Sequence, residues 1–283
     1  MEVFDIPLHD LAAFAVAIAP DEVVAGWTAA RGLLEVSGRW PVATTSWNLG
    51  PVDPAELFSR FPFETSSQHD AAPLAVLARA EAIDIAEHIA ERLAALREEE
   101  PVDEWIDHEV NETYTKFGVA PSVEEVWHAI ADEGLQGRVD LDRWLFGWEL
   151  ANVEEPTSLQ PPDLGYQEWY QPSGQSAIVF LPTPRPWETL GFMSWWASEF
   201  AGGNEPLVAV LNDWYDRFGA ELVAHWGTML QVVTSRRPSD PEAAWHLALE
   251  HELIAPDTLQ QLPVREHART LLQANRWLLH ERP

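Results

Sequence analysis

The sequence predicts an α/β protein of the α+β kind, in which helices pack on a small mixed sheet and an acidic helical segment is inserted. Three observations favour this fold class. Apolar strand-like segments alternate with amphipathic helical segments from residue 177 onward, a strand–helix–strand pattern occupies the first fifty residues, and residues 73–150 have helical periodicity. At 283 residues, with 46% hydrophobic residues and 15 Trp, the chain can bury a large core.

The N-terminal part, residues 1–72, is predicted to contain a strand, a helix and a second strand. The apolar run "AFAVAIA" at 13–19 predicts the first strand. The Pro-Asp-Glu sequence at 20–22 suits the first turn of a helix, because Pro needs no hydrogen bond there and acids complement the helix dipole. Gly38 is expected to end that helix, and "RWPVATTSW" at 39–47 predicts the second strand.

Residues 73–153 are predicted to form an acidic helical region. Its first helix is expected to run until Pro101, with one apolar stripe made of Leu74, Ala78, Ala82, Ile85, Ile89, Leu93 and Leu96. Further helices are predicted around 102–117, 122–132 and 140–148.

The C-terminal part, residues 154–283, begins with a Pro-rich linker and is predicted to be α/β. Strands are expected in "QEWYQ" (167–171) and "SAIVFLPT" (176–183), joined by a turn at 172–174. The amphipathic stretch "LVAVLNDWYDRFGAELVA" then predicts a helix that stops at Gly219 and a strand after it. A turn at Gly227-Thr228, a strand in "MLQVVTSRRP", a helix in "DPEAAWHLALEHELI" and a late strand in "NRWLLHERP" complete the order.

This order, with "WYDRFGAELV" (214–223) at its centre, resembles the uncharacterised bacterial family called domain of unknown function 4253. The resemblance covers about 177–283. The stretch "GWTAARGLLEVSGRWPV" is similar to the N-terminal part of longer members, which gives a weaker match over about 11–47. The resemblance implies the fold order and a bacterial origin, and the family brings no assigned activity.

The charge of the chain is strongly acidic. The formal net charge is −29, from 46 Asp and Glu against 17 Lys and Arg, and residues 81–155 carry 21 acidic and 5 basic side chains. Such a surface repels phosphate backbones, which argues against nucleic-acid binding. It favours either plain solubility or an acidic face that docks a basic protein partner. The sequence makes no prediction of the oligomeric state.

The sequence also limits the compartment and the chemistry. No apolar run reaches the roughly 20 residues of a membrane helix, and the acidic start "MEVFDIPLHD" is unlike a signal peptide, so we expect a cytoplasmic protein that does not bind membranes. The absence of Cys excludes disulfides, Cys nucleophiles and thiolate zinc sites.

No catalytic or metal-binding constellation is predicted, and no cofactor. The carboxylate–histidine pairs of the helical region fall mostly on its polar faces, at Asp84–His88, Glu104–His108 and Glu125–His128. His246 and His251 are five residues apart, so one helical face cannot present both to a metal. Neither a Gly-x-Ser-x-Gly elbow nor a phosphate-binding loop is present.

One loop is a candidate binding site. Trp195 and Trp196 are adjacent, so they cannot both face one core, and Glu199 and Asn204 follow them. An exposed Trp in this loop is a candidate binding hot spot, whereas packing of both rings and an N-cap role for Asn204 are the structural alternatives. The family resemblance implies Gly-Gly-Trp-Asn and Cys-Pro in this loop, and this chain departs from that pattern.

The leading hypothesis is therefore a non-enzymatic protein-binding module of immunity or antitoxin type, with an acidic face for a basic partner. A first alternative is a hydrolase whose site gathers His225, His246 or His251 with distant carboxylates. A second alternative is a small-molecule binder that uses the Trp195-Trp196 loop as a wall.

Overall fold

The computed structural model describes residues 3–8, 11–45, 72–158, 176–193, 195, 203–259 and 262–281. These residues group into two compact units. The first draws on Met1–Ile85, Gln167–Arg236 and Asn275–Pro283, and the second on Ala86–Tyr166 and Arg237–Ala274. The expected domain limits near residues 73 and 154 stay a prediction, because these units are groups of contacts rather than parts shown to fold separately.

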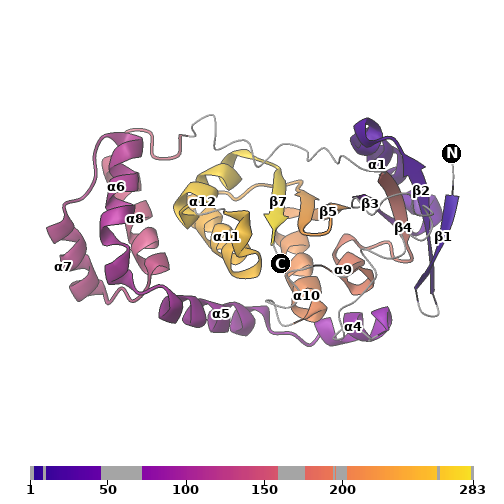
Figure 1. Cartoon of the computed structure of the whole chain (residues 1–283), viewed down its shortest axis with the longest axis horizontal. Helices are drawn as coiled ribbons and strands as arrows, with labels where there is room; N and C mark the ends of the chain where they lie inside the picture. Colours follow the sequence, from indigo (N-terminus) through magenta and orange to yellow (C-terminus); the bar gives the residue numbers. More distant parts are fainter. Residues whose placement is uncertain are drawn as a thin grey trace, which may run out of the picture. The chain divides into compact units, whose positions relative to one another are not determined.

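The first unit is built on a mixed sheet, as predicted, and the described residues give it seven strands in the order β1-β2-β4-β3-β5-β6-β7. Among the strands that the structure describes (Figure 1), only β3 and β5 pair in parallel. Its strands are β1 (Val3–Leu8), β2 (Leu11–Ile18), β3 (Trp40–Thr45), β4 (Ser176–Leu181), β5 (Glu221–His225), β6 (Met229–Val233) and β7 (Arg276–His280). Its helices are α1 (Val23–Arg31), α2 (Leu34–Ser37), α4 (Pro73–Ala80), α9 (Thr189–Phe192) and α10 (Asn204–Phe218).

The central strands β3 and β4 are buried along their whole length, which is why their sequences are apolar without alternation. Helix α1 packs on both of them. Two indoles fix this core, because Trp27 donates to the carbonyl of Pro41 and Trp40 to that of Leu222, each at 2.9 Å. Both donors are thereby satisfied away from water.

The predicted helix–strand–strand order after residue 204 is confirmed. Helix α10 stops at Gly219, whose φ of 62° is the left-handed conformation that glycine adopts most easily. Strand β5 follows at once and pairs with β6 as an antiparallel hairpin, and β7 then extends the sheet on the other side of β6.

The single apolar stripe predicted between residues 74 and 96 is wrong. The stretch forms two helices, α4 and α5 (Ile85–Glu99), and Leu74 is 61% exposed. The buried side chains of α4 are instead Pro73, Val76 and Ala80, which share another face of the same helix. This segment is rich in Ala and Leu, so two stripes compete, and packing of α4 against α10 and α9 selects between them.

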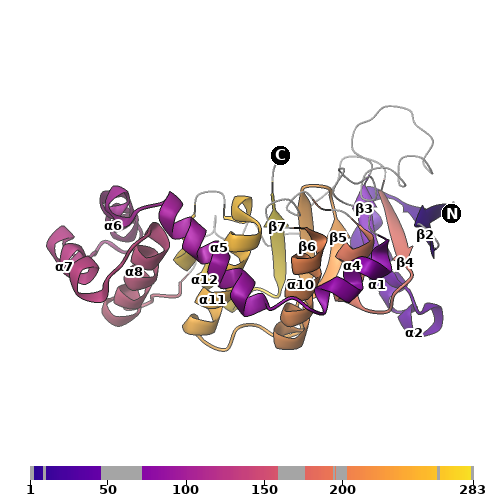
Figure 2. The same ribbon diagram turned by 90° about the horizontal axis from the view of Figure 1, so that it is seen from below.

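The second unit is helical. Besides α5 it contains α6 (Ile106–Phe117), α7 (Val123–Glu133), α8 (Arg138–Asn152), α11 (Pro241–Ile254) and α12 (Val264–Gln273). A small apolar core joins α6, α7 and α8 through Ile106, Val126, Leu141 and Leu145. Figure 2 shows α11 and α12 beside α8, and α12 contacts both α8 and α11.

Two helices of this unit begin at side chains that cap the backbone. Ser122 and Glu125 form a reciprocal capping box at α7, and Asp240 accepts from the backbone of Ala243 at α11. Helix α12 was not predicted as a separate element.

Two predictions lie outside the described residues, namely the strand at 167–171 and the turn at 172–174. No helix within the described ranges is long and apolar enough to cross a membrane.

Candidate functional site: an acidic helical surface

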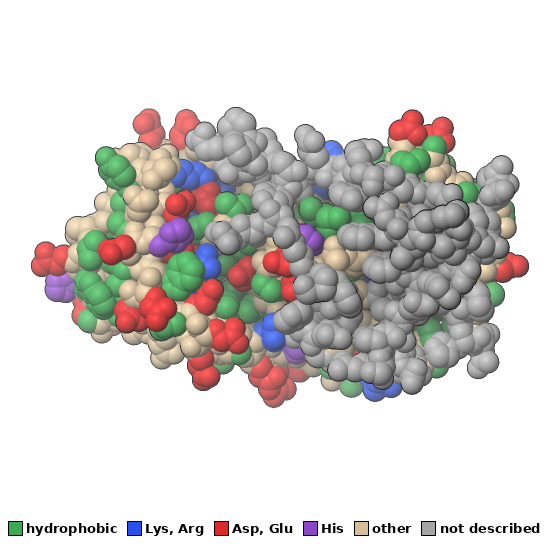
Figure 3. Space-filling view, in the orientation of Figure 1, with side chains coloured by type: hydrophobic (Ala, Val, Ile, Leu, Met, Phe, Trp, Pro, Cys, Tyr) green, Lys and Arg blue, Asp and Glu red, His purple; other side chains and the backbone are tan. Residues whose placement is uncertain are grey.

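Most acidic side chains of residues 86–158 in the second unit project into solvent. Between residues 86 and 158, which are described throughout, fourteen Asp and Glu residues are exposed, whereas each of the five Arg and Lys residues is at least partly buried. Figure 3 shows the red carboxylates scattered over the part of this face that carries α6, α7 and α8. The charge asymmetry of the sequence therefore becomes an asymmetry of the surface.

The basic side chains of this stretch are engaged within the unit. Arg97 Nε lies 3.0 Å from Asp140 Oδ2, and Arg138 Nε lies 3.0 Å from Glu109 Oε1. The other three basic residues contact acceptors of α11 and α12. Lys116 pairs with Glu266 of α12, Arg143 pairs with Glu242 of α11, and Arg92 donates to the carbonyl of Leu253 near the end of α11. Few cations of this stretch remain to neutralise the exposed carboxylates, so the surface keeps a negative potential.

Exposed apolar side chains lie among these acids on α6, α7 and the turn between them. Trp127 is 49% exposed and Tyr114 59% exposed. Val123 stands four residues before Trp127, on the same face of α7. We call Tyr114, Val119, Val123 and Trp127, with the exposed carboxylates of the two helices, the α6–α7 surface. Among these carboxylates, Glu124 has a side chain that is 87% exposed.

A buried ionic cluster supports the helices that carry this surface. Arg265 of α12 places Nη1 2.6 Å from Glu109 Oε2 of α6 and Nε 3.1 Å from Glu149 Oε1 of α8. Its backbone N–H and its guanidinium also donate to Asp142. Arg269, one turn later, pairs with the second oxygen of Glu149. All five side chains are buried, so the cluster fixes the packing of α6, α8 and α12 and offers no access to a substrate.

The electrostatics of the cluster follow from its composition. Burial alone would lower the pKa of Arg265, but Asp142, Glu109 and Glu149 raise it well above its usual value. Burial raises the pKa of Asp142 to about 6, and Arg265 opposes that effect. Arg138 also pairs with Glu109, so three arginines face the three carboxylates, and burial rather than an excess of negative charge is the main cause of the raised pKa of Asp142.

The sequence-predicted binding residues are placed only in part. Trp195 is 3% exposed, and its ring belongs to the packed interior. Asn204 is buried at the first position of α10, and Gly203 rather than Asn204 occupies the N-cap. Trp196 and Glu199 lie outside the described residues, so the proposed cluster of four stays a prediction.

The histidines of the hydrolase alternative stand in different surroundings. His225 belongs to β5 of the first unit, where its Nδ1 accepts from the backbone of Gly227 at 3.1 Å. His246 is exposed on α11, and its Nε2 lies 3.0 Å from Oε1 of Glu242. His251 is buried in the same helix, with its Nδ1 2.8 Å from Nε2 of His267. Within the described ranges, no three His, Asp or Glu side chains are placed to hold a metal ion.

Sequence reasoning missed the α6–α7 surface and the ionic cluster. The exposed Trp127 had a signal, because Val126, Ala129 and Ile130 fill the apolar face of α7 and leave Trp127 off it. The buried acids had none, since nothing in the sequence separates Glu109 or Glu149 from the other carboxylates of this acidic chain.

Comparison with known proteins supports the resemblance of the C-terminal region. Residues 177–280 match the model of the family described as "Domain of unknown function (DUF4253)". The similarity of residues 11–47 to longer members stays a prediction. Neither a curated protein nor a solved structure matches the chain.

Proposed function

We propose that this chain is a bacterial, cytoplasmic binding protein of immunity or antitoxin type, which holds a basic protein partner on its α6–α7 surface. The observation that carries the proposal is a half-exposed Trp127 set among solvent-exposed carboxylates. Interface hot spots are enriched in Trp and Tyr, and charges around them accelerate the approach of an oppositely charged partner.

The internal pairing of the basic residues also supports a basic partner for the α6–α7 surface. An acidic surface interrupted by exposed lysines and arginines would attract partners of either sign. Here the one Lys or Arg of α6 and α7, Lys116, is only 12% exposed and faces Glu266. The surface therefore discriminates in favour of a cationic protein, such as a basic toxin that the chain neutralises.

Affinity capture from the native host tests the proposal. The full chain is expected to retain a basic protein at low salt and to release most of it as salt rises, because exposed charge pairs are screened. Trp127→Ala should reduce recovery by at least about tenfold, which is the effect of removing a hot spot worth 1.4 kcal/mol or more. Glu124→Lys should reduce it as well.

The matched control is Glu35→Lys, which reverses an exposed acid on α2 of the first unit. It changes the net charge equally and should leave recovery unchanged. Capture that survives both Trp127→Ala and Glu124→Lys, or that falls equally with Glu35→Lys, would show that the α6–α7 surface is not the docking site.

A further inference from the structure

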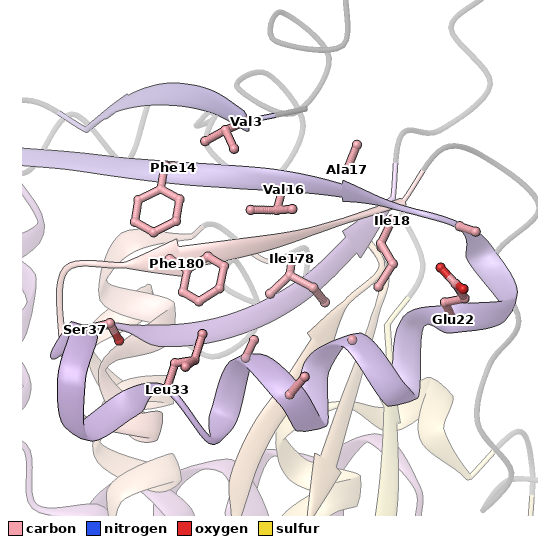
Figure 4. A pocket seen from close by; sticks show the side chains of 14 residues that line it. Val3, Phe14, Val16, Ala17, Ile18, Glu22, Leu33, Ser37, Ile178 and Phe180 are labelled. Carbon is pink, nitrogen blue, oxygen red and sulfur yellow. The ribbon is translucent and has the colours of Figure 1, made fainter. Parts of the chain in front are cut away.

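The first unit contains a cavity that the proposed function does not use. It lies between α1 and the strands β2 and β4, and its volume is about 880 Å³ (Figure 4). The strand side chains that line it share one face of the sheet, because Phe14 is paired in register with Phe180 and Val16 with Ile178. In Figure 4 these four side chains point toward α1.

The cavity is apolar along its length. Phe14 and Phe180 stack at one end, with ring centroids 4.7 Å apart, and Ile18 lies near the other. Four residues of strand separate Phe14 from Ile18, which corresponds to about 13 Å. On the helix side, Gly26 and Ala29 line the cavity, and Leu33 lies beside Phe180. Ile18 packs closely on Gly26, where an added Cβ would lie 1.9 Å from Ile18 Cδ1.

The two ends of the cavity differ in polarity. Glu22 and Ser37 are the polar side chains of its lining, and Figure 4 shows them at opposite ends. Arg39 adjoins the Ser37 end, because its backbone N–H donates to Ser37 Oγ and its guanidinium lies 5.5 Å from the Phe14 ring centroid. The Ser37 end therefore has a cation beside its lining, although Asp5, paired in register with Phe14, adds a carboxylate on the same face of the sheet, and the other end has Glu22.

Among the described residues, the guanidinium of Arg39 donates hydrogen bonds through one of its nitrogens. Its Nη1 donates to the carbonyl of Ala12 at 2.6 Å and, at 3.5 Å, to that of Phe180. Within the described part of the chain nothing accepts from Nε or Nη2, and no carboxylate contacts this arginine. Five N–H groups in a planar fork suit a carboxylate, which such a fork binds through two parallel hydrogen bonds.

We propose that this cavity binds a long-chain aliphatic carboxylate. The alkyl chain lies along Phe14, Val16 and Ile178, and the carboxylate is held by Arg39. The volume falls within the range of roughly 300–1,000 Å³ that small-molecule sites occupy, and the lining matches their usual pattern of apolar walls with a few polar groups. Glu22 repels the carboxylate of the ligand from the opposite end of the cavity, so the alkyl chain has one preferred direction.

Titration calorimetry of the full chain with dodecanoate, kept below its micelle concentration, tests this proposal. We expect one site per chain, weaker binding of the short-chain butyrate, and no comparable binding of dodecyltrimethylammonium. Arg39→Gln should weaken dodecanoate binding by about tenfold or more, the effect of losing a charge-assisted pair. Arg39→Lys should restore part of it.

A second variant tests the site without touching the charge. Ala29 is an exposed position on α1 that lines the cavity, so Ala29→Trp should fill the cavity while α1 stays folded, and should abolish dodecanoate binding. Glu124→Lys, which reverses an exposed acid of the second unit, is the control here and should bind as the wild type does. Absence of dodecanoate binding by the wild type, or unchanged binding in Ala29→Trp, would overturn the proposal. Equal affinity for the cationic surfactant would overturn the assignment of Arg39.

Discussion

The Nε atom of Arg265 lies 3.1 Å from Oε1 of Glu149, and both side chains are buried. The arginine stands within the residues that match the family model, 177–280, and the glutamate stands outside them. Glu109 and Asp142, the other carboxylates that Arg265 contacts, also stand outside the matched residues. The charge of Arg265 is thus balanced by carboxylates on helices that precede the matched region.

Arg265→Met is expected to destabilise the second unit by about 3–5 kcal/mol, because it leaves three buried carboxylates without their common cation. Urea denaturation followed by circular dichroism measures the change. Arg237→Met is the matched control, since Arg237 is exposed and, among the described residues, donates to the carbonyl of Gln273. Its expected effect is below about 0.5 kcal/mol. A similar loss in both variants would contradict a stabilising role for the cluster.

A fragment of residues 177–283 is expected to leave α12 unfolded, because Arg265 and Arg269 would lack Glu109, Asp142 and Glu149. Hydrogen exchange provides the measurement. Amides of 264–273 should be protected in the full chain and exchange rapidly in the fragment. Equal protection in both proteins would mean that α12 folds without these carboxylates.

Acid is expected to destabilise the chain through His267. Burial lowers the pKa of this imidazole from 6.5 to about 4, so the unfolded chain binds more protons between these values. The free energy of unfolding therefore falls as pH falls from 6.5 to 4, by about 3 kcal/mol in total from this group. Asp142 acts in the opposite sense, since its raised pKa lets the folded state take up a proton below about pH 6.

Comparison with His267→Gln separates these two effects, because the variant retains Asp142 and removes the imidazole. Denaturation of both proteins at several pH values should give a difference in unfolding free energy that changes between pH 6.5 and 4 and is flat above pH 7. A difference that is constant with pH would show that His267 does not titrate in this range.

Two glycines are expected to respond oppositely to alanine. Gly219 has a φ of 62°, and a Cβ there would lie 2.0 Å from Ser235 Oγ, so Gly219→Ala should cost about 1–2 kcal/mol. Gly147 lies inside α8, where an added Cβ would meet nothing within 4 Å, so Gly147→Ala should stabilise by about 0.5–1 kcal/mol. Thermal unfolding of the two variants checks the signs, and a stabilised Gly219→Ala would contradict the cap assignment.

Local signals were sufficient for part of the fold. The stop of α10 at Gly219, the hairpin after it and the start of α11 at Asp240 each depend on residues within a few positions of the element, so the sequence predicts them. Helix α12 had such a signal too, since Val264, Ala268 and Leu271 are spaced for one apolar face after Pro263.

The rest depends on contacts between distant segments. The buried face of α12 includes Arg265 and Arg269, residues that sequence patterns assign to the surface. Their partners are up to 156 residues away, so only the folded unit reveals them. In the same way, the choice of buried face in α4 is made by α10, and the cavity beside Arg39 forms because β2 and β4 bring Phe14 and Phe180 together.

The kinetics of partner binding test the central claim most directly. The association rate constant of the captured basic protein with the full chain should fall steeply as salt rises, and Glu124→Lys should lower it at low salt and flatten the slope. Trp127→Ala should mainly raise the dissociation rate constant, and Glu35→Lys should change neither. An association rate constant that is independent of salt, or equal in Glu124→Lys and the wild type, would contradict an acidic docking surface on α6 and α7.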